Sequence, residues 1–344
     1  MKRPLSIAGG LLALLIAAAL AAAPRPTDAA DAGLRAASRV KTLTFSYRSH
    51  AGTTQKAHLV LPTWYGRQRH PAIPFVISPH GRGVNGEYNL RFWGELPADG
   101  PFALISPDGQ GRLLPRYSWG FRGHLDDLAR MPALARKAFP WLSVDQRRVY
   151  VIGDSMGAQE ALLLAARPAV RLAGVAAFDP VTDMAARYRQ WLVTPGLQRL
   201  RPIARKEFGG TPDQRPRAYA DRSPAAKLKA IAANRVPIQL WWSYRDSIIA
   251  NQPQDTGAFY KRFVALAPRA PVQEVVGYWE HARAMHPETQ LPAALACFGL
   301  VSPEGISVPA YRQEGPNGPI VELPPEQMEQ PVAFTRAFCG RAGT

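Results

Sequence analysis

The pentapeptide at residues 153–157, Gly-Asp-Ser-Met-Gly, constrains the fold of this chain more than any other stretch. It follows the apolar run 148–152 and precedes the helix-favouring run 158–164, so the local pattern is strand, sharp turn, helix. In that context G-x-S-x-G is typical of a nucleophile elbow. Glycine removes the Cβ atoms that would clash two positions either side of the serine. The pattern predicts a catalytic Ser155; the alternative is a Gly-rich turn without chemistry.

Segments at the N-terminus point to export. Residues 2 and 3 are basic, residues 11–22 are an unbroken apolar run, and small residues follow. This order is typical of a secretory signal peptide, which we place at residues 1–23. The alternative is a membrane anchor, but the run is shorter than the roughly 20 residues that a spanning helix needs. We expect residues 24–39 to be a disordered leader, and the mature protein to be secreted, in the periplasm or outside the cell, with no integral membrane segment.

Only two cysteines occur, Cys297 and Cys339. In an oxidising compartment an isolated pair is more often a disulfide than two free thiols. The bridge would hold the C-terminal tail to the body of the protein. Cysteines this far apart do not form a metal site of the usual spacing.

Composition bounds the class of protein. The chain has 344 residues, 47% of them hydrophobic, which is enough for one large domain with a substantial core. The net charge is +16, but the charges are scattered, and no zinc-finger, RNA-recognition or helix-turn-helix pattern accompanies them. We therefore expect no nucleic-acid partner. An arginine bias, with some attraction to an anionic cell envelope, explains the charge.

Strand and helix patterns alternate along most of the chain. Two runs, 42–47 and 55–61, flank Gly52 and predict an antiparallel hairpin at one edge of a sheet. Near-continuous apolar runs later in the chain are typical of parallel strands buried on both faces. The pattern predicts an α/β fold, a mostly parallel sheet of about eight strands with helices on both faces. The further strands are expected at 75–78, 102–106, 148–152, 174–178, 238–243 and 272–276, and helices at 87–95, 125–138, 158–166, 256–266 and 286–298.

Two stretches break the alternation. Residues 184–223 are rich in arginine, proline and aromatic residues and lie between two predicted strands, so we interpret them as a cap insertion over the site. Residues 301–344 are Pro-rich and are expected to wrap the surface of the 40–300 domain.

A serine nucleophile needs a base and a carboxylate that orients the base. After an elbow of this kind, the chain order is serine, acid, histidine. Asp246 follows the strand predicted at 238–243 and is our candidate acid, with Asp179 and Asp183 as alternatives. Any of these carboxylates could instead cap a helix or pair with an arginine.

Of the seven histidines, only His281 and His286 follow both Ser155 and the candidate acid. His281 lies directly after the last predicted strand, where a loop can return it to the serine. His286 precedes Pro287 and is expected to cap the next helix. We therefore favour His281 as the base, the alternative being a surface loop residue.

Attack on an ester or amide also needs donors for the oxyanion. One candidate is the backbone N–H of Met156, directly after the serine. The second is expected from the loop 78–83, where Gly81 allows the backbone to approach closely and the N–H of Arg82 is our choice. The Arg82 side chain could meet an acidic substrate, although a solvated arginine is the commoner case.

Taken together, these residues resemble the α/β-hydrolase superfamily, and within it the catalytic domain of the prolyl oligopeptidase and acylaminoacyl peptidase group and related secreted esterases. The resemblance covers about residues 40–300. It implies the α/β-hydrolase fold, a triad of Ser155, Asp246 and His281, an acyl-enzyme, and no metal or organic cofactor. The features that carry it are His80-Gly81, the elbow at Ser155, the stretch 222–224 before the acid strand, and the spacing from Asp246 to His281.

The chain departs from the oligopeptidases in two ways. About forty residues precede the first strand, too few for the β-propeller of that group, and the elbow continues Gly-Ala where the peptidases usually have Gly-Gly. The first hypothesis is therefore a secreted serine esterase acting on a small-molecule ester. The alternatives are a secreted peptidase that uses the same triad on short peptides, and a non-catalytic binding module. Oligomeric state, acyl-chain length and natural substrate stay open, because a fold does not determine them.

Overall fold

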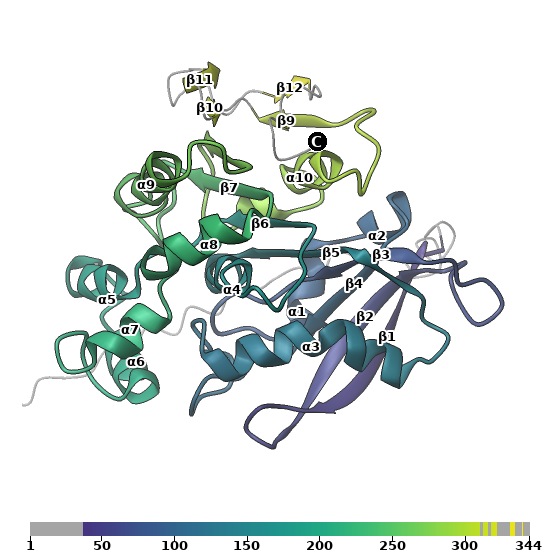
Figure 1. Cartoon of the computed structure of the whole chain (residues 1–344), viewed down its shortest axis with the longest axis horizontal. Coiled ribbons are helices and arrows are strands. Elements are labelled where there is room, and N and C mark those ends of the chain that lie inside the picture. The colour runs from purple at the N-terminus through teal and green to yellow at the C-terminus, as the bar shows by residue number, and fades with distance from the viewer. Residues whose placement is uncertain (1–36, 310–311, 316–317, 322–330, 334–338, 340–344) are drawn as a thin grey trace, which may run out of the picture. The chain divides into compact units, whose positions relative to one another are not determined.

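The computed structural model describes residues 37–309, 312–315, 318–321, 331–333 and 339 (Figure 1). Residues 38–344 form one unit of the chain. The predicted signal peptide at 1–23 lies outside the described residues, as does nearly all of the predicted leader at 24–39.

Ten strands form one sheet, in the order β1-β2-β4-β3-β5-β6-β7-β8-β10-β11. The pairs from β4 through β3, β5, β6 and β7 to β8 are all parallel, whereas β1, β2, β10 and β11 join by antiparallel pairing. Strands β1 to β8 are the eight that the sequence predicts. Their bounds are β1 Val40–Arg48, β2 Thr54–Pro62, β3 Ile73–Ile77, β4 Ala103–Pro107, β5 Val144–Asp154, β6 Gly174–Phe178, β7 Ile238–Ser243 and β8 Val272–Gly277.

Helices bury both faces of this sheet, as predicted. Successive strand residues alternate between two apolar cores, because side chains point to opposite faces of a strand: Val149 and Val151 join one core, Tyr150 and Ile152 the other. The first core takes in α3 (Arg122–Ala138), α4 (Ser155–Ala165), α8 (Leu228–Asn234) and α9 (Ala258–Leu266), and the second takes in α2 (Leu96–Asp99) and α10 (Leu291–Cys297). In Figure 1, α3, α4 and α8 lie in front of the strands.

A separate group of helices fills the stretch between β6 and α8. It comprises α5 (Met184–Val193), α6 (Leu200–Phe208), α7 (Pro216–Asp221) and the short 3-10 turn η2 (Pro224–Lys227). These helices, which lie at the lower left in Figure 1, form an apolar core separate from the two cores of the sheet. That core includes Trp191 from α5, Phe208 from α6 and Tyr219 from α7, and it also contains Met156 from the predicted elbow.

Two predicted helices are wrong in extent. The stretch 87–95 forms α1 (Gly86–Asn89) followed by a 3-10 turn, η1 (Leu90–Phe92). The helix expected at 286–298 starts only at Leu291, with Gln290 at its N-cap position. His286 does not cap it: His286 has extended backbone before Pro287, because proline disfavours the helical conformation in the residue before it. Between β7 and α9 the chain also forms a π-helical turn, η3 (Pro253–Gly257), and a 3-10 turn, η4 (Arg283–Met285), precedes α10.

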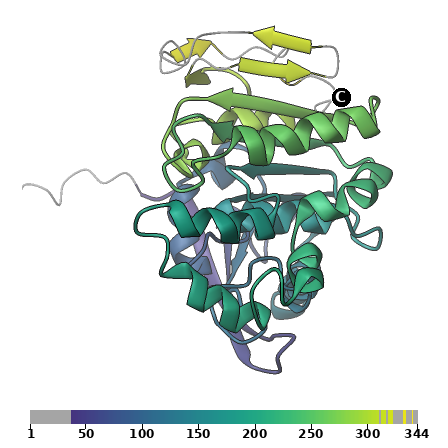
Figure 2. The same cartoon turned by 90° about the vertical axis from the view of Figure 1, so that its left-hand side faces the viewer.

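The C-terminal region contains strands that the sequence analysis did not predict. β10 (Arg312–Gly315) pairs antiparallel with β8 and with β11 (Gly318–Val321), which extends the sheet. β9 (Ser307–Pro309) pairs with β12 (Pro331–Ala333) in a small second sheet. Figure 2 shows these yellow strands at the end of the molecule beyond α9. The predicted disulfide is present: Cys297 of α10 is bonded to Cys339, with a Cα–Cα distance of 5.0 Å.

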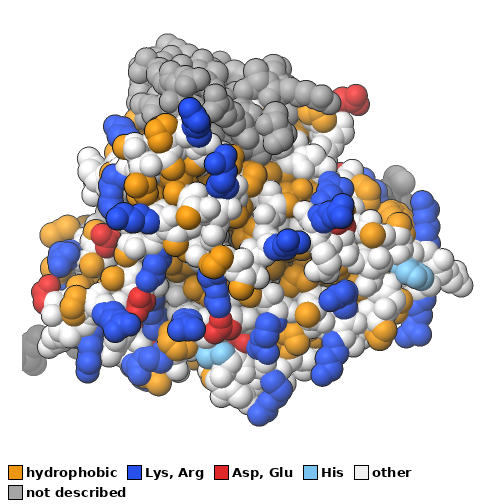
Figure 3. All heavy atoms as spheres, viewed as in Figure 1, with side chains coloured by type: hydrophobic (Ala, Val, Ile, Leu, Met, Phe, Trp, Pro, Cys, Tyr) orange, Lys and Arg blue, Asp and Glu red, His pale blue; other side chains and the backbone are white. Residues whose placement is uncertain are grey.

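Across the described residues, no helix combines the length and the apolar character that crossing a membrane requires. Lysine and arginine side chains are spread over the face shown in Figure 3 among apolar and other residues, in keeping with the scattered charge of the sequence.

Candidate functional site

Ser155 occupies the sharp turn that the sequence predicts. β5 ends at Asp154, α4 begins at Ser155, and the φ angle of Ser155 is +53°, a left-handed conformation that is costly for a residue with a side chain. The flanking glycine at 157 is required by space, because a Cβ there would lie 2.1 Å from the carbonyl oxygen of Pro79. At Gly153 a Cβ would lie 2.8 Å from the carbonyl carbon of Gly157.

Strand register places the other candidate residues at the same edge of the sheet. Asp154 pairs with Phe178 at the end of β6, and Phe178 pairs with Trp241 in β7. Ser155 and Asp179 are therefore the next residues after adjacent, aligned strand ends. Ser243 at the end of β7 is aligned in turn with Gly277 at the end of β8, and Asp246 and His281 follow these two. Parallel strands deliver all four loops to one edge, as in other open α/β sheets.

The structure brings His281 and Asp246 into direct contact. The Nδ1 atom of His281 lies 2.8 Å from Oδ2 of Asp246, and the His281 side chain is 14% exposed. The Asp246 carboxylate is buried and accepts three further hydrogen bonds, from the backbone N–H groups of Ile248 and Ile249 and from the side chain of Gln252. A carboxylate held this way fixes the ring orientation of the histidine and leaves Nε2 as the nitrogen available for proton transfer.

Electrostatics distinguish the two residues of this pair. Burial alone would raise the pKa of Asp246, but the bond to His281, the His281 charge and the other hydrogen bonds lower it below its ordinary value. Burial alone would lower the pKa of His281, but the bond and charge of Asp246, with the charges of Asp179 and Asp154, raise it above its ordinary value. The pair therefore combines an ionised carboxylate with a strengthened base.

The two alternative acids have other contacts. Asp183 is the N-cap of α5, where its side chain accepts hydrogen bonds from the N–H groups of Ala185 and Ala186. Asp179 is fully buried, and its Oδ2 accepts from the indole of Trp279 at 3.2 Å and the N–H of Ala282 at 2.8 Å. Both donors belong to the loop that carries His281, so Asp179 holds that loop in place. Burial and the nearby Asp246 charge raise the pKa of Asp179 well above its ordinary value.

The side chains of Asp179, Asp246 and His281 each place one potential metal-binding atom within 4.8 Å of the others, which is close enough to suggest a metal centre. Their contacts argue otherwise, because the Nδ1 atom of His281 is bonded directly to Asp246 and Oδ2 of Asp179 already accepts two N–H bonds. The three side chains fit a hydrogen-bonded system better than a ligand set.

A buried carboxyl that the sequence analysis passed over lies beside the serine. Asp154 is 4% exposed, and burial raises its pKa to about 6, against the attraction of His281. Gly81 approaches it closely, since a Cβ on Gly81 would lie 3.1 Å from Oδ2 of Asp154. Asp154 is the second residue of the pentapeptide at 153–157. Many residue types occur at this position of such a turn, so the sequence alone did not predict a role for Asp154.

The loop after β3 is braced by His80. Its Nε2 accepts a hydrogen bond from the N–H of Gly109 at 2.9 Å, so Nδ1 carries the proton and donates to the carbonyl of Gly81 at 2.7 Å. Burial lowers the pKa of His80, which keeps the ring neutral in this arrangement. In the described part of the chain, the N–H groups of Met156 and Arg82 donate to no protein acceptor. Both remain free for a substrate oxygen.

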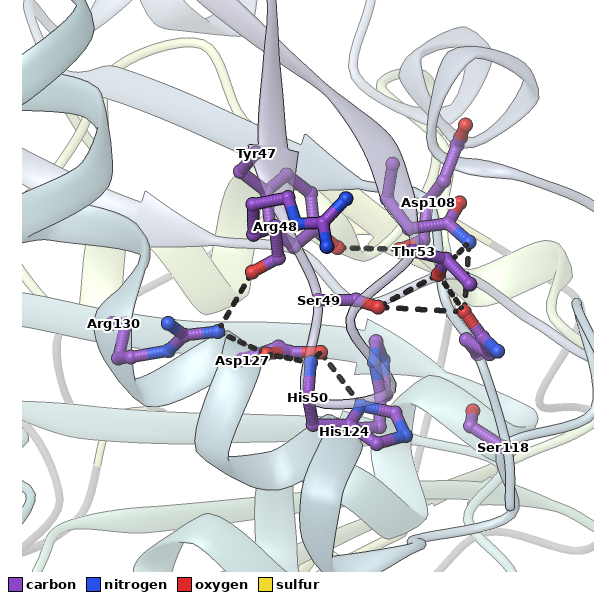
Figure 4. Close-up of polar contacts among 12 residues, drawn as sticks. Tyr47, Arg48, Ser49, His50, Thr53, Asp108, Ser118, His124, Asp127 and Arg130 are labelled. Carbon is purple, nitrogen blue, oxygen red and sulfur yellow. Dashed lines mark hydrogen bonds and ion pairs between the residues drawn. The ribbon is translucent and has the colours of Figure 1, made fainter. Parts of the chain in front are cut away.

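A second histidine–aspartate pair shows that such a contact is not by itself a functional sign. His50 Nδ1 lies 2.7 Å from Oδ2 of Asp127, and the same carboxylate accepts the backbone N–H of His50 and contacts Arg130 (Figure 4). The ring packs against Phe121, with centroids 5.3 Å apart. This pair attaches the turn of the β1–β2 hairpin to α3 and belongs to a different part of the sheet from Ser155.

Comparisons with known proteins support the fold. No family model matches the chain, and no curated protein matches it in sequence. It is similar in structure to an S-formylglutathione hydrolase from Staphylococcus aureus, with a TM-score of 0.52 and 15% identity over 71% of this chain and 93% of that one. It is also similar to an esterase from Rhizomucor miehei, with a TM-score of 0.53 and 15% identity over 72% and 78% of the two chains.

A third similar structure is an acylaminoacyl peptidase in complex with a chloromethyl ketone, with a TM-score of 0.58 and 14% identity over 78% of this chain. The present chain covers only 43% of that protein. At these identities the likenesses concern the fold alone. With the strand order described above, they show that this chain has the α/β-hydrolase fold that the sequence resemblance implied.

Proposed function

We propose that the protein is a serine hydrolase that cleaves a carboxylic ester through an acyl-enzyme on Ser155. The observation that carries the proposal is the geometry of one sheet edge. Ser155 lies in a left-handed turn at the end of β5, and the hydrogen-bonded pair of His281 and Asp246 follows the aligned ends of β8 and β7. These are the nucleophile, base and orienting carboxylate that acyl transfer needs.

In the acylation step, the Ser155 hydroxyl oxygen attacks the ester carbonyl carbon while Nε2 of His281 takes the hydroxyl proton. The carbonyl oxygen becomes an oxyanion, which the N–H groups of Met156 and Arg82 stabilise as hydrogen-bond donors. The C–O bond to the alcohol then breaks, and His281 returns the proton to the leaving oxygen. Asp246 stays ionised throughout and stabilises the imidazolium that forms.

In the deacylation step, a water molecule takes the place of the alcohol. His281 removes a proton from this water as its oxygen attacks the acyl carbon, and the same proton then returns to the Ser155 oxygen as the acid departs. Gly81 supports both steps by keeping the loop after β3 close to the elbow, and His80 holds that loop through its bonds to Gly81 and Gly109.

A matched substrate pair tests the proposal. One acyl group is presented as a 4-nitrophenyl ester and as a 4-nitroanilide to the purified mature protein and to Ser155→Ala. We expect turnover of the ester that the substitution abolishes, with little cleavage of the anilide. Comparable cleavage of the anilide would instead support a peptidase with the same residues.

A fluorophosphonate probe separates an enzyme from a binding module. It should label the wild-type protein at Ser155 and leave Ser155→Ala unlabelled, because only an activated serine attacks phosphorus readily. Absence of both labelling and ester turnover would reject the hydrolase proposal.

We also propose that the protein is exported, as the predicted signal peptide indicates. The Cys297–Cys339 disulfide supports this, because such bridges persist in oxidising compartments. N-terminal sequencing of the protein from the medium or periplasm should begin after about residue 23; a cytoplasmic protein that retains residue 1 would contradict it.

A further inference from the structure

Arg82 belongs to the loop after β3, which packs against the Ser155 turn. It follows Gly81, whose backbone packs against Asp154, and it precedes Gly83, whose N–H bonds to the carbonyl of Arg116 at 2.9 Å. The same loop contacts the elbow at Pro79, whose carbonyl oxygen lies so close to Gly157 that a side chain there would clash. The backbone of Arg82 therefore lies close to the Ser155 turn.

The guanidinium of Arg82 differs from the other arginines of this basic chain. Its side chain is partly buried, and within the described residues it forms no ion pair and no hydrogen bond to a protein acceptor. Burial lowers its pKa, and the charge of Arg199 lowers it further against the influence of Tyr117. None of its guanidinium nitrogens is among the buried atoms without a partner in the described residues, so solvent reaches this group and an acceptor on a bound molecule could reach it too.

A second arginine reaches the same region from α5. Arg187 is 4% exposed, and its guanidinium contacts the carbonyl of Ile248, in the Asp246 loop, and the side chain of Gln190. No carboxylate in the described part of the chain lies within ion-pair distance of it. Burial lowers the pKa of Arg187 to about 10; the charges of Asp246 and Asp255 act against burial, and the charge of Arg82 acts with it. A buried guanidinium and a partly buried one therefore lie beside the proposed site, and the charge of Arg82 is felt at Arg187.

The positive charge of the Arg82 guanidinium indicates that its binding partner is an anion. The charges of Asp246 and Asp255 already offset that of Arg187, whereas in the described residues Arg82 has no carboxylate within ion-pair distance, so an anion would be attracted to Arg82. A carboxylate suits the planar guanidinium particularly well, because it accepts two parallel N–H bonds. Tyr117, whose hydroxyl lies near Gly83, belongs to the border of the aromatic core of α5–α7, so apolar surface adjoins the charged group.

We propose that the Arg82 side chain, with support from Arg187, selects esters that carry a carboxylate close to the scissile bond. This inference rests on the proposed function, because it names the substrate class of the same serine hydrolase. The substrate is then a half-ester of a dicarboxylic acid, or an ester whose alcohol carries a carboxylate, rather than a neutral fatty-acyl ester.

Two matched substrate pairs test the proposal. On the acyl side, mono-4-nitrophenyl adipate is compared with 4-nitrophenyl hexanoate, which differs by a carboxylate in place of a methyl group. On the alcohol side, 4-acetoxybenzoate is compared with its methyl ester. We expect the wild-type protein to prefer the anionic member of at least one pair by kcat/KM, and the preference to fall as NaCl screens the charges.

The variant Arg82→Gln removes the charge and leaves the backbone N–H in place. We expect it to lose about 10- to 100-fold more in kcat/KM on the preferred anionic ester than on its neutral partner, the range for a hydrogen bond to a charged group. Arg171→Gln changes the net charge equally at an exposed loop after α4 and should leave the ratio unchanged. Arg187→Gln is less informative, because it also removes the contact to Ile248.

The outcomes separate this inference from the proposed function. Equal hydrolysis of both members of both pairs, or an equal loss on both members in Arg82→Gln, would overturn the carboxylate preference while leaving a working esterase. No Ser155-dependent hydrolysis of any of the four esters would instead overturn the proposed function and this inference with it.

Discussion

At the scale of single residues, three buried carboxyls surround His281, and each has different contacts. Asp246 bonds to the ring, Asp179 bonds to the loop that carries it, and Asp154 lies at the end of β5 beside the serine. Their pKa values are separated accordingly, with Asp246 lowered and the other two raised. Neighbouring carboxyls in different environments commonly take different chemical roles.

The raised pKa of His281 predicts the pH dependence of activity. The base acts as neutral imidazole, so kcat/KM should rise with pH through a value above the ordinary 6.5 of histidine, and activity is lost as pH falls below it. Asp154→Asn removes one of the charges that raise this pKa and should move the acid limb to lower pH. Asp145→Asn, the same change at the opposite end of β5, is the control. An unmoved limb in Asp154→Asn would contradict the assignment.

The choice of acid is tested by a second pair of variants. Asp246→Asn should lower kcat/KM by about 10³–10⁴, because the amide cannot hold the productive tautomer of His281. Asp179→Asn keeps an oxygen that can accept from Ala282 and should cost much less. Ester turnover is measured for both, with circular dichroism to verify folding. A larger loss in Asp179→Asn would make Asp179 the acid.

At the scale of elements, a buried charge pair inside the α5–α7 insertion, Glu207 with Arg222, also contacts the backbone of the loop between β4 and α3. Glu207 of α6 is fully buried and accepts from the backbone N–H groups of Leu113 at 2.8 Å and Leu114 at 3.1 Å, and it also contacts the N–H of Arg112. The guanidinium of Arg222 lies 3.1 Å from the same carboxylate and stacks over the ring of Phe208. The position of α6 therefore depends on a loop between β4 and α3.

Removing one partner should be costly. Glu207→Gln leaves the buried charge of Arg222 uncompensated, and we expect the free energy of unfolding to fall by about 3–5 kcal/mol. Urea denaturation followed by circular dichroism measures it. Asp213→Asn is the control within the same insertion, because the Asp213 side chain is 84% exposed in its pair with Arg189 and should have little effect. Equal effects in the two variants would show that burial of the pair is not what stabilises the insertion.

At the scale of the whole molecule, the disulfide links α10 to the end of the chain across 42 residues of sequence. Between these cysteines the chain adds β10 and β11 to the sheet beside β8, the strand that precedes His281. The bridge restricts the unfolded chain and so favours the folded state. The C-terminal region thereby covers an edge of the sheet that would otherwise be open.

Replacing both cysteines tests this contribution. The double variant Cys297→Ser with Cys339→Ser should lose about 2–4 kcal/mol of unfolding free energy, the usual range for a bridge. Denaturation of the wild-type protein under reducing conditions serves as the control and should give a similar loss. Unchanged stability in both would mean that the unfolded chain gains no freedom when the bridge is absent.

Sequence patterns predicted the central sheet well, because strands and turns depend on local sterics and hydrophobic spacing. The expected runs coincide with β1 to β8, and β6 and β7 match residue for residue, but the run expected at 148–152 covers only the middle of β5 (Val144–Asp154). Helix ends were less predictable: α10 starts five residues late because Pro287 keeps His286 extended. β10 was missed because its pairing with β8 is a contact between distant segments, and no local pattern in a Pro-rich stretch indicates it.

For the site, the sequence alone determined the position and conformation of Ser155, because glycines at 153 and 157 are the residues that so tight a turn can accommodate. It narrowed the acid to three aspartates and the base to two histidines by chain order. Only the tertiary structure decided which side chains meet, because the 2.8 Å contact of His281 with Asp246 spans 35 residues and depends on how two loops fold. The burial of Arg82 and the anchoring of α6 by Glu207 likewise depend on segments that meet only when the chain is folded.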